Sequence, residues 1–381
     1  MLTTVLILAN ESRRRVLQAV VSESGTLMVH TALGHYPNVS EMQRLIRVAD
    51  PQVAFIDLTH PHEAMDVLNE VRRQWPRTAL IGVDPPENVN LDVTGFGGYI
   101  SLPPDQADLS AAVSRAVRRV SGDVYPNLWS FLPAKAGCGC STVVAQTALE
   151  LAAMGKRVLV LECDLRSGVM SLMLKARPMG SMQNALSAVG AQEGHRLNAS
   201  LTELHGVDFL LSSRIRMERL PDWSDFHGLL DLLVPKYDLV LADLPELVNE
   251  ATAEVVLRSR AVHLVSTQEL LSLELAPRRL AELAACGVGG DKVKLVVNRF
   301  HRQELSIADV QTHVGRPVVF QIPNDYAAVR RALVAGAGVD RESGLGKAFK
   351  NLAAALANGG DPVETGSGGW GSLLGKLRLA G

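Results

Sequence analysis

Residues Pro133–Thr142 read PAKAGCGCST, and this stretch decides how the larger part of the chain is interpreted. A phosphate-binding loop ends in Gly-Lys-Ser/Thr, because its lysine reaches the β- and γ-phosphates of a nucleotide. Here Gly139 and Ser141 hold the outer two positions, but Cys140 stands between them, and a lysine occurs only earlier, at Lys135. The stretch is therefore a phosphate loop without its usual lysine, a different kind of site, or a coincidence.

The sequence on either side of the loop favours a phosphate site. The apolar run Leu128–Leu132 before it predicts a buried strand, and the run STVVAQTALELAAMG after it predicts a helix that ends at Gly155. The helical spacing is carried by Val144, Ala148, Leu151 and Ala152. Strand, glycine loop and helix in this order aim backbone N–H groups and a helix N-terminus at an anion. In such a site the Ser141 hydroxyl would bind Mg²⁺.

The composition sets the broad class of protein. A chain of 381 residues with 47% hydrophobic residues suggests two or three packed domains, and its formal net charge of −2 gives no reason to expect a specific nucleic-acid partner. Four cysteines make no disulfide framework, which indicates a reducing compartment. No stretch approaches the roughly 20 apolar residues of a membrane span, so a cytoplasmic protein is expected.

Two series of short apolar runs alternate with helical patterns, which predicts two α/β domains with parallel sheets. Residues 1–121 are expected to form a flavodoxin-like domain, and residues 127–358 a P-loop-type doubly wound sheet. The first series has strand candidates at Val5–Leu8, Leu27–Ala32, Val53–Leu58, Ala79–Val83 and Gly97–Leu102. The second has them at Leu128–Leu132, Arg157–Leu161, Val207–Leu211, Leu239–Ala242, Ala261–Val265, Val293–Val297 and Pro317–Phe320.

The segment Pro51–Pro61 in the first series resembles the third strand of response-regulator receiver domains, with Asp57 at the position of the phosphate-accepting aspartate. The acidic pair expected after the first strand is replaced by Ala9 and Asn10, and the expected Lys-Pro step by Leu102-Pro103. The resemblance therefore implies a degenerate receiver used for protein contact or dimerisation, with no phosphorelay. The alternative is an aspartate kept for local hydrogen bonding. The arginines Arg13–Arg15 are predicted to lie on a solvated helix face.

Lys135–Thr142 resembles the deviant loop of MinD/ParA-type ATPases, K-G-G-x-G-K-[ST]-[ST]. The resemblance implies that Lys135 is the signature lysine, which reaches the partner's nucleotide across a homodimer. It also implies that the loop residues Ala136, Gly137, Cys138, Gly139, Cys140, Ser141 and Thr142 hold ATP or ADP with Mg²⁺.

Further segments resemble the same family. GKRVLVLECDLRSG (Gly155–Gly168) resembles the strand that carries the family's D-x-D, with Glu162 in the first of these places and Asp164 as the residue that orients the attacking water. YDLVLADLPE (Tyr237–Glu246) resembles the Walker B strand, with Asp243 as a carboxylate for Mg²⁺. VVNRF and QIPNDY resemble the adenine-side segments, which implies that Asn298 and Pro323 lie near the base.

The phrase FLPAK before the loop and the two-domain order resemble the TadZ/CpaE family. This implies a factor at the cell pole or the inner face of the membrane, which helps to place the secretion machinery of Flp-type (tad) pili. Two alternatives remain, namely an active ParA/MinD-type ATPase that positions another cargo, and a scaffold that binds no nucleotide.

The absence of the loop lysine bears on hydrolysis. A phosphate loop binds largely through its main chain, so nucleotide binding can survive Cys140, but the charge that a lysine brings to the transferring phosphoryl group is lost. We therefore expect binding with very slow hydrolysis. Cys138, Cys140 and Cys163 also allow a metal or redox reading, although buried thiols are the commoner case.

Residues 359–381 are predicted to form a Gly-rich linker and a short amphipathic helix. Trp370, Leu373, Leu374 and Leu377 share one helical face, which would contact a membrane or a protein surface.

Overall fold

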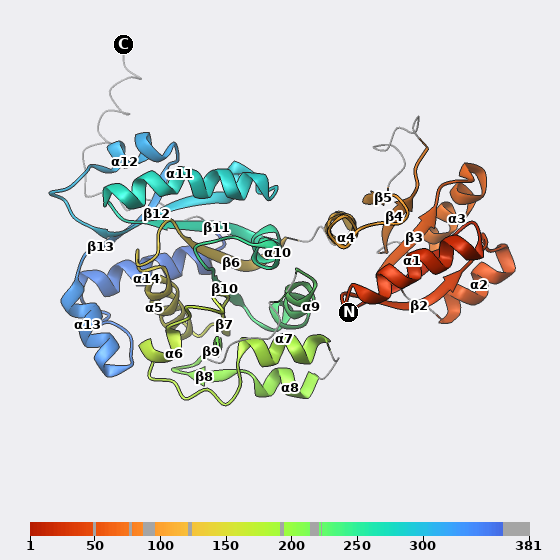
Figure 1. The fold of residues 1–381 in the computed structure, drawn as a ribbon. Helices are drawn as coiled ribbons and strands as arrows, with labels where there is room; N and C mark the ends of the chain where they lie inside the picture. The colour runs from red at the N-terminus through yellow and green to blue at the C-terminus, as the bar shows by residue number, and fades with distance from the viewer. Residues whose placement is uncertain are drawn as a thin grey trace, which may run out of the picture. The chain divides into compact units, whose positions relative to one another are not determined.

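The computed structural model describes residues 1–48, 51–75, 78–86, 96–120, 124–190, 194–213, 221 and 223–360 (Figure 1). It contains two compact units, one built on Met1–Asp123 and one on Val124–Pro221 and the chain from Phe226 onward. The predicted amphipathic helix with Trp370, Leu373, Leu374 and Leu377 lies outside the described residues. No helix in the described parts of the chain has the length and apolar character needed to cross a membrane.

The first unit is a sheet of five parallel strands in the order β2-β1-β3-β4-β5. Its strands are β1 (Leu2–Ile7), β2 (Leu27–Leu33), β3 (Val53–Asp57), β4 (Ala79–Val83) and β5 (Gly98–Ile100). Its helices are α1 (Glu11–Glu23), α2 (Val39–Val48), α3 (Pro61–Gln74) and α4 (Gln106–Val120). Successive strand residues point to opposite faces, and α1 and α4 pack on the face opposite to α2 and α3.

The second unit is a sheet of eight strands in the order β13-β12-β11-β6-β10-β7-β9-β8. Its strands are β6 (Tyr125–Pro133), β7 (Val158–Glu162), β8 (Thr202–Leu204), β9 (Val207–Leu210), β10 (Leu239–Asp243), β11 (Ser259–Ser266), β12 (Val293–Phe300) and β13 (Val318–Pro323). Its helices are α5 (Cys140–Ala153), α6 (Met170–Met173), α7 (Met182–Gly190), α8 (Gly194–Ala199), α9 (Trp223–Leu233), α10 (Glu250–Arg258), α11 (Leu270–Ala285), α12 (Ile307–Val314), α13 (Tyr326–Ala335) and α14 (Gly344–Ala357). Two 3-10 turns complete it, η1 (Val234–Lys236) and η2 (Gly290–Lys292).

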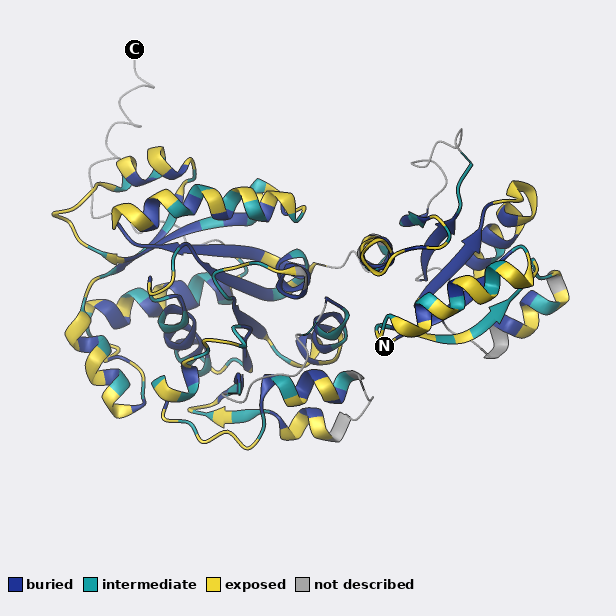
Figure 2. Ribbon diagram, viewed as in Figure 1, coloured by how far each residue is buried: buried dark blue, intermediate teal, exposed yellow. Residues whose placement is uncertain are grey.

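The strand β6 lies inside this sheet between β10 and β11, which explains its long apolar run. Leu128 and Leu132 point into one core with α7, α9 and α11, whereas Trp129 and Phe131 point into the other with α5, α13 and α14. Figure 2 shows the strands buried and the outer faces of the helices exposed. A central buried strand of this kind fixes where the loop after Pro133 begins.

The expected parallel sheet is present, with one departure. The strand β8 was not predicted, and it pairs with β9 in the antiparallel direction at the sheet edge. It is three residues long, and the two residues that join it to β9, His205 and Gly206, both have positive φ, 53° and 79°. Two left-handed residues form a tight hairpin turn, so a His-Gly pair between apolar residues was the available signal.

Candidate nucleotide-binding site

The loop from Ala134 to Gly139 joins the carboxyl end of the interior strand β6 to the N-terminus of α5. Gly137 and Gly139 have left-handed backbones, with φ of 82° and 89°, which side chains other than glycine rarely adopt. A Cβ on Gly139 would also lie 2.5 Å from Asn298 Nδ2. The two glycines therefore turn the chain sharply and leave room for the Asn298 side chain, and the backbone of the loop opens at a helix N-terminus.

Asn298, on β12, holds the loop in place through a hydrogen bond. Its Nδ2 donates a 2.8 Å hydrogen bond to the Cys138 carbonyl, and its side chain is buried. The Cys138 thiol donates to the Val265 carbonyl at 3.3 Å. In this structure Asn298 therefore holds the phosphate loop, while its predicted role near the base, and that of Pro323 at the end of β13, stay predictions.

Two glutamates reach the beginning of the loop. Lys135 Nζ lies 3.3 Å from Glu269 Oε2, and the Ala136 N–H donates to Glu246 Oε2 at 2.9 Å. Glu246 follows the end of β10, and Glu269 directly precedes α11. Sequence reasoning missed both contacts, because neither glutamate belongs to the loop pattern and only the fold brings them to it.

Cys140 and Ser141 form the first turn of α5. The Cys140 side chain is buried in the core beneath the loop, and burial, followed by the Asp243 carboxylate, raises the pKa of its thiol well above the usual value. At the position where a phosphate loop has a cation, this chain therefore has a neutral, inward-facing thiol. Ser141 and Thr142 are half-buried at the same helix end.

Asp243 ends β10, beside β6 and opposite Glu162 of β7. Burial raises the pKa of its carboxyl group to about 7; the neighbouring Ser141 and Cys140 side chains oppose this rise, whereas the charges of Glu162 and Asp164 add to it. Its Oδ1 is buried and has no hydrogen-bond partner among the described residues. A buried carboxylate oxygen of this kind, next to a serine hydroxyl, fits a site for a divalent cation.

Glu162 and Asp164 lie at the same sheet edge but differ in what they bind. Glu162 is buried and accepts hydrogen bonds from the backbone of Met170 and Ser212, at 2.8 Å each, so it is a structural residue here. Asp164 is half-buried and its Oδ1 accepts from the Arg166 and Ser167 N–H groups, at 3.1 and 2.8 Å. Its predicted role in orienting a water stays a prediction.

The cysteines give no support to a metal or redox site. All four are free thiols, and Cys138, Cys140 and Cys163 are buried. Within the described ranges no group of three or more His, Cys, Asp or Glu side chains could hold a metal ion by itself. Magnesium at Asp243 and Ser141 would therefore depend on phosphate oxygens and water for its other ligands.

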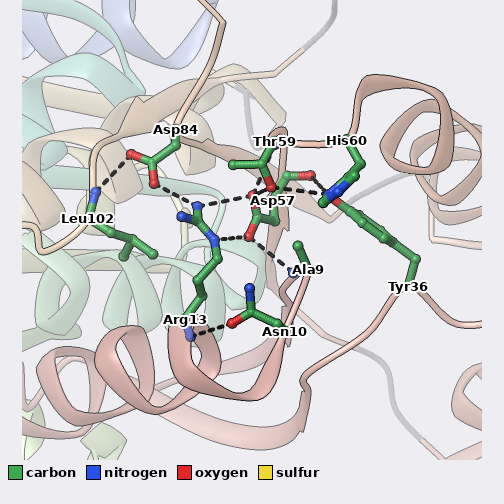
Figure 3. Close-up of polar contacts among 9 residues, drawn as sticks. All are labelled: Ala9, Asn10, Arg13, Tyr36, Asp57, Thr59, His60, Asp84 and Leu102. Atoms are coloured by element: carbon green, nitrogen blue, oxygen red, sulfur yellow. Dashed lines mark hydrogen bonds and ion pairs between the residues drawn. The ribbon is translucent and has the colours of Figure 1, made fainter.

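Asp57 in the first unit lies in a ring of donors (Figure 3). Its side chain is fully buried, and its oxygens accept from Arg13 at 2.5 and 3.1 Å, from the Ala9 N–H at 3.0 Å, and from the Thr59 N–H and hydroxyl at 3.0 and 2.8 Å. Arg13 also pairs with Asp84 at 2.6 Å. Burial would raise the pKa of Asp57, but the hydrogen bonds from Arg13, Ala9 and Thr59 outweigh it and hold the pKa below its usual value.

The prediction that Arg13–Arg15 form a solvated face is therefore wrong for Arg13. Arg14 pairs with the exposed Glu11 but is itself no more exposed than Arg13, and of the three only Arg15 is largely exposed. The guanidinium of Arg13 supplies the positive charge between Asp57 and Asp84. This supports the alternative of an aspartate kept for local hydrogen bonding.

A glycine loop between an interior parallel strand and a helix, with an acidic residue at the end of the adjacent strand, defines the second unit as a P-loop-type α/β protein. No family model matches the chain. It is 24% identical over 243 residues to the septum site-determining protein MinD of Thermotoga maritima, which covers 60% of this chain and 88% of that protein. It is 23% identical over 257 residues to MinD of Synechocystis, and the matched part covers 64% of this chain and 94% of that protein.

Solved structures show the same fold. A ParA family ATPase from Chlorobium tepidum matches with a TM-score of 0.54 and 18% identity, over 60% of this chain and 99% of that one. A chain of the MinC:MinD cell division protein complex of Aquifex aeolicus matches with a TM-score of 0.53 and 18% identity, over 62% of this chain and 98% of that one. Matches of this length are longer than the first unit and are close to the length of the second. The second unit has the MinD/ParA fold, and its similarity to MinD sequences supports the MinD/ParA ATPase superfamily.

Proposed function

We propose that this chain binds ATP or ADP with Mg²⁺ through the Lys135–Thr142 loop and acts as a dimerising switch with slow or no hydrolysis. One observation carries the proposal: the left-handed Gly137 and Gly139 open the loop backbone at the N-terminus of α5, and the buried Asp243 has one carboxylate oxygen, Oδ1, without a hydrogen-bond partner among the described residues. Backbone N–H groups and the helix end would hold the phosphates, and Ser141 with Asp243 would hold the cation.

The surface near the loop supports the proposed homodimer. Lys135 is partly exposed, and three exposed leucines directly follow the glutamates that reach the loop: Leu247 after Glu246, and Leu270 and Leu271 after Glu269. Large apolar side chains exposed to solvent favour a protein contact. Lys135 would reach the partner's nucleotide across this face.

In the cell, we place this switch with the secretion machinery of Flp-type (tad) pili, at the pole or the inner face of the membrane. The FLPAK phrase (Phe131–Lys135) and a receiver-like first unit support this assignment. The strand order β2-β1-β3-β4-β5 is that of flavodoxin-like sheets, as a receiver requires. The partners would be pilus assembly proteins, and the segment with Trp370 and Leu373 would contact the membrane.

A second candidate is an active positioning ATPase for another cargo. It is favoured by Lys135 and Asp164, which occupy the positions of the signature lysine and of the water-orienting aspartate in the sequence motifs. The site would then hydrolyse ATP in spite of Cys140.

Equilibrium binding and light scattering test the proposal. Titration of the full chain with Mg-ATP and Mg-ADP should show saturable binding, and bound nucleotide should increase the fraction of dimer. Lys135→Ala should keep the binding and lose the dimer. A chain that binds neither nucleotide is a scaffold, and a Lys135→Ala variant that still dimerises would remove Lys135 from the interface.

A further inference from the structure

The Ala136 N–H, one of the loop amides, is already bound by an anionic group of the chain itself. The Glu246 carboxylate accepts from it at 2.9 Å through Oε2. Its other oxygen, Oε1, lies 3.3 Å from Arg279 Nη2, so the carboxylate is held from both sides. Since a phosphate loop works by offering its N–H groups to phosphate oxygens, Glu246 competes for the same donors as the ligand.

Glu246 is held in this place. Arg279, on α11, has a largely buried side chain and pairs with both Glu246 and Glu282. A buried arginine with two carboxylate partners is a stable support, because withdrawal of either partner leaves part of its charge uncompensated. The position of the Glu246 carboxylate is therefore fixed by the ion pair that joins the segment after β10 to α11.

The charges around the loop make the competition by Glu246 depend on how many phosphates the nucleotide carries. Cys140 brings no cation, Lys135 is paired with Glu269, and Glu246 adds a negative charge at the start of the loop. Asn298 donates a hydrogen bond to the carbonyl of Cys138, toward the other end of the loop. The sequence predicts that the base lies near Asn298, and in that orientation each further phosphate would bring negative charge closer to Glu246.

We propose that Glu246 makes this site selective for a nucleoside diphosphate over the triphosphate. The inference rests on the proposed nucleotide-binding function and adds a specificity-determining residue to it. The diphosphate would use the helix end and the later loop amides. The triphosphate would in addition have to displace Glu246 from Ala136 or lie beside its charge. The resting state would then hold ADP.

Calorimetric titration of the full chain with Mg-ADP and Mg-ATP tests the inference. The wild type should bind ADP about tenfold or more tightly than ATP, since the negative charge of Glu246 opposes the more highly charged ligand. Glu246→Gln should keep the affinity for ADP and bring the two affinities to within about threefold. Glu246→Ala, a second variant that removes the carboxylate, should also bring the affinities for ADP and ATP closer together.

Glu282→Gln is the matched control, because Glu282 pairs with the same arginine but has no contact with the loop among the described residues. It should leave the ratio of the two affinities unchanged. An equal ratio in the wild type and both Glu246 variants, or a wild type that prefers ATP, overturns the selectivity and leaves nucleotide binding intact. No binding of either nucleotide by any variant overturns the proposed function as well.

Discussion

At the scale of single residues, Asp243 has a buried carboxyl group whose pKa is near 7. The same group ionises near 3.8 when exposed. Between these values the folded state binds more protons than the unfolded state, so Asp243 lowers the stability progressively as the pH rises to about 7. Bound Mg²⁺ would reverse this effect by favouring the ionised form.

Asp243→Asn should remove this pH dependence. Without magnesium or nucleotide, the stability advantage of the variant over the wild type should grow by on the order of 3 kcal/mol between pH 5 and pH 8. Urea unfolding at several pH values measures it. Parallel curves for the two proteins would mean that Asp243 titrates normally.

Arg13 is a second residue with a measurable role. Arg13→Ala should destabilise the first unit by about 3 kcal/mol or more, because it leaves the fully buried Asp57 without its cation. Arg15→Ala is the control, since Arg15 is exposed and pairs only weakly with Glu11 at 3.4 Å. Equal unfolding midpoints for the two variants would show that the Asp57 pair contributes nothing to stability.

At this scale the sequence predicted which residues lie at strand ends and helix starts better than it predicted which side chains contact one another. Periodicity predicted the strand and the helix on either side of the Gly-rich loop, and with them the place of Ser141 at the helix start, whereas Lys135 and Asp243 were assigned by resemblance to family motifs. It did not reveal Glu246 on Ala136, or Arg13 on Asp57, since these pairs lie 110 and 44 residues apart in the chain. Only the order of strands in the sheet brings such pairs together.

At the scale of elements, α5 has a left-handed glycine at each end, Gly139 at its start and Gly155 after its end. A Cβ on Gly155 would meet nothing within 4 Å, whereas a Cβ on Gly139 would meet the Asn298 side chain that fastens the loop. The two positions therefore differ in surroundings and share the same backbone requirement.

Gly155→Ala should cost about 1–2 kcal/mol, the penalty for a left-handed residue with a side chain. It should leave Mg-ADP affinity unchanged. Gly139→Ala should destabilise further and weaken Mg-ADP binding by about tenfold or more, because the loop amides move away from the ligand. Thermal unfolding and calorimetry measure the two effects, and equal affinities in both variants would mean that the Gly139 turn does not shape the site.

Elements were predicted well where apolar runs are long, as in β6, and poorly at the sheet edge. β8 is three residues long and half exposed, so it has no apolar pattern to detect, and its pairing depends on the turn at His205 and Gly206.

At the scale of the whole chain, the proposed function is that of a switch that holds a nucleotide and hydrolyses it slowly. The thiol of Cys140 faces the core beneath the loop, and Glu246 and Glu269 add negative charge at its start. A site with this charge balance lacks the preorganised cation that stabilises phosphoryl transfer. The slow step would then suit a factor that stays in place once assembled.

The steady-state rate of ATP hydrolysis by the full chain at saturating Mg-ATP is the most direct measurement of this claim. Cys140→Lys should be faster than the wild type by about a hundredfold, the usual effect of one preorganised charge. Cys140→Ala, which removes the thiol without adding charge, should match the wild type. A wild type that hydrolyses ATP as fast as Cys140→Lys would contradict the account.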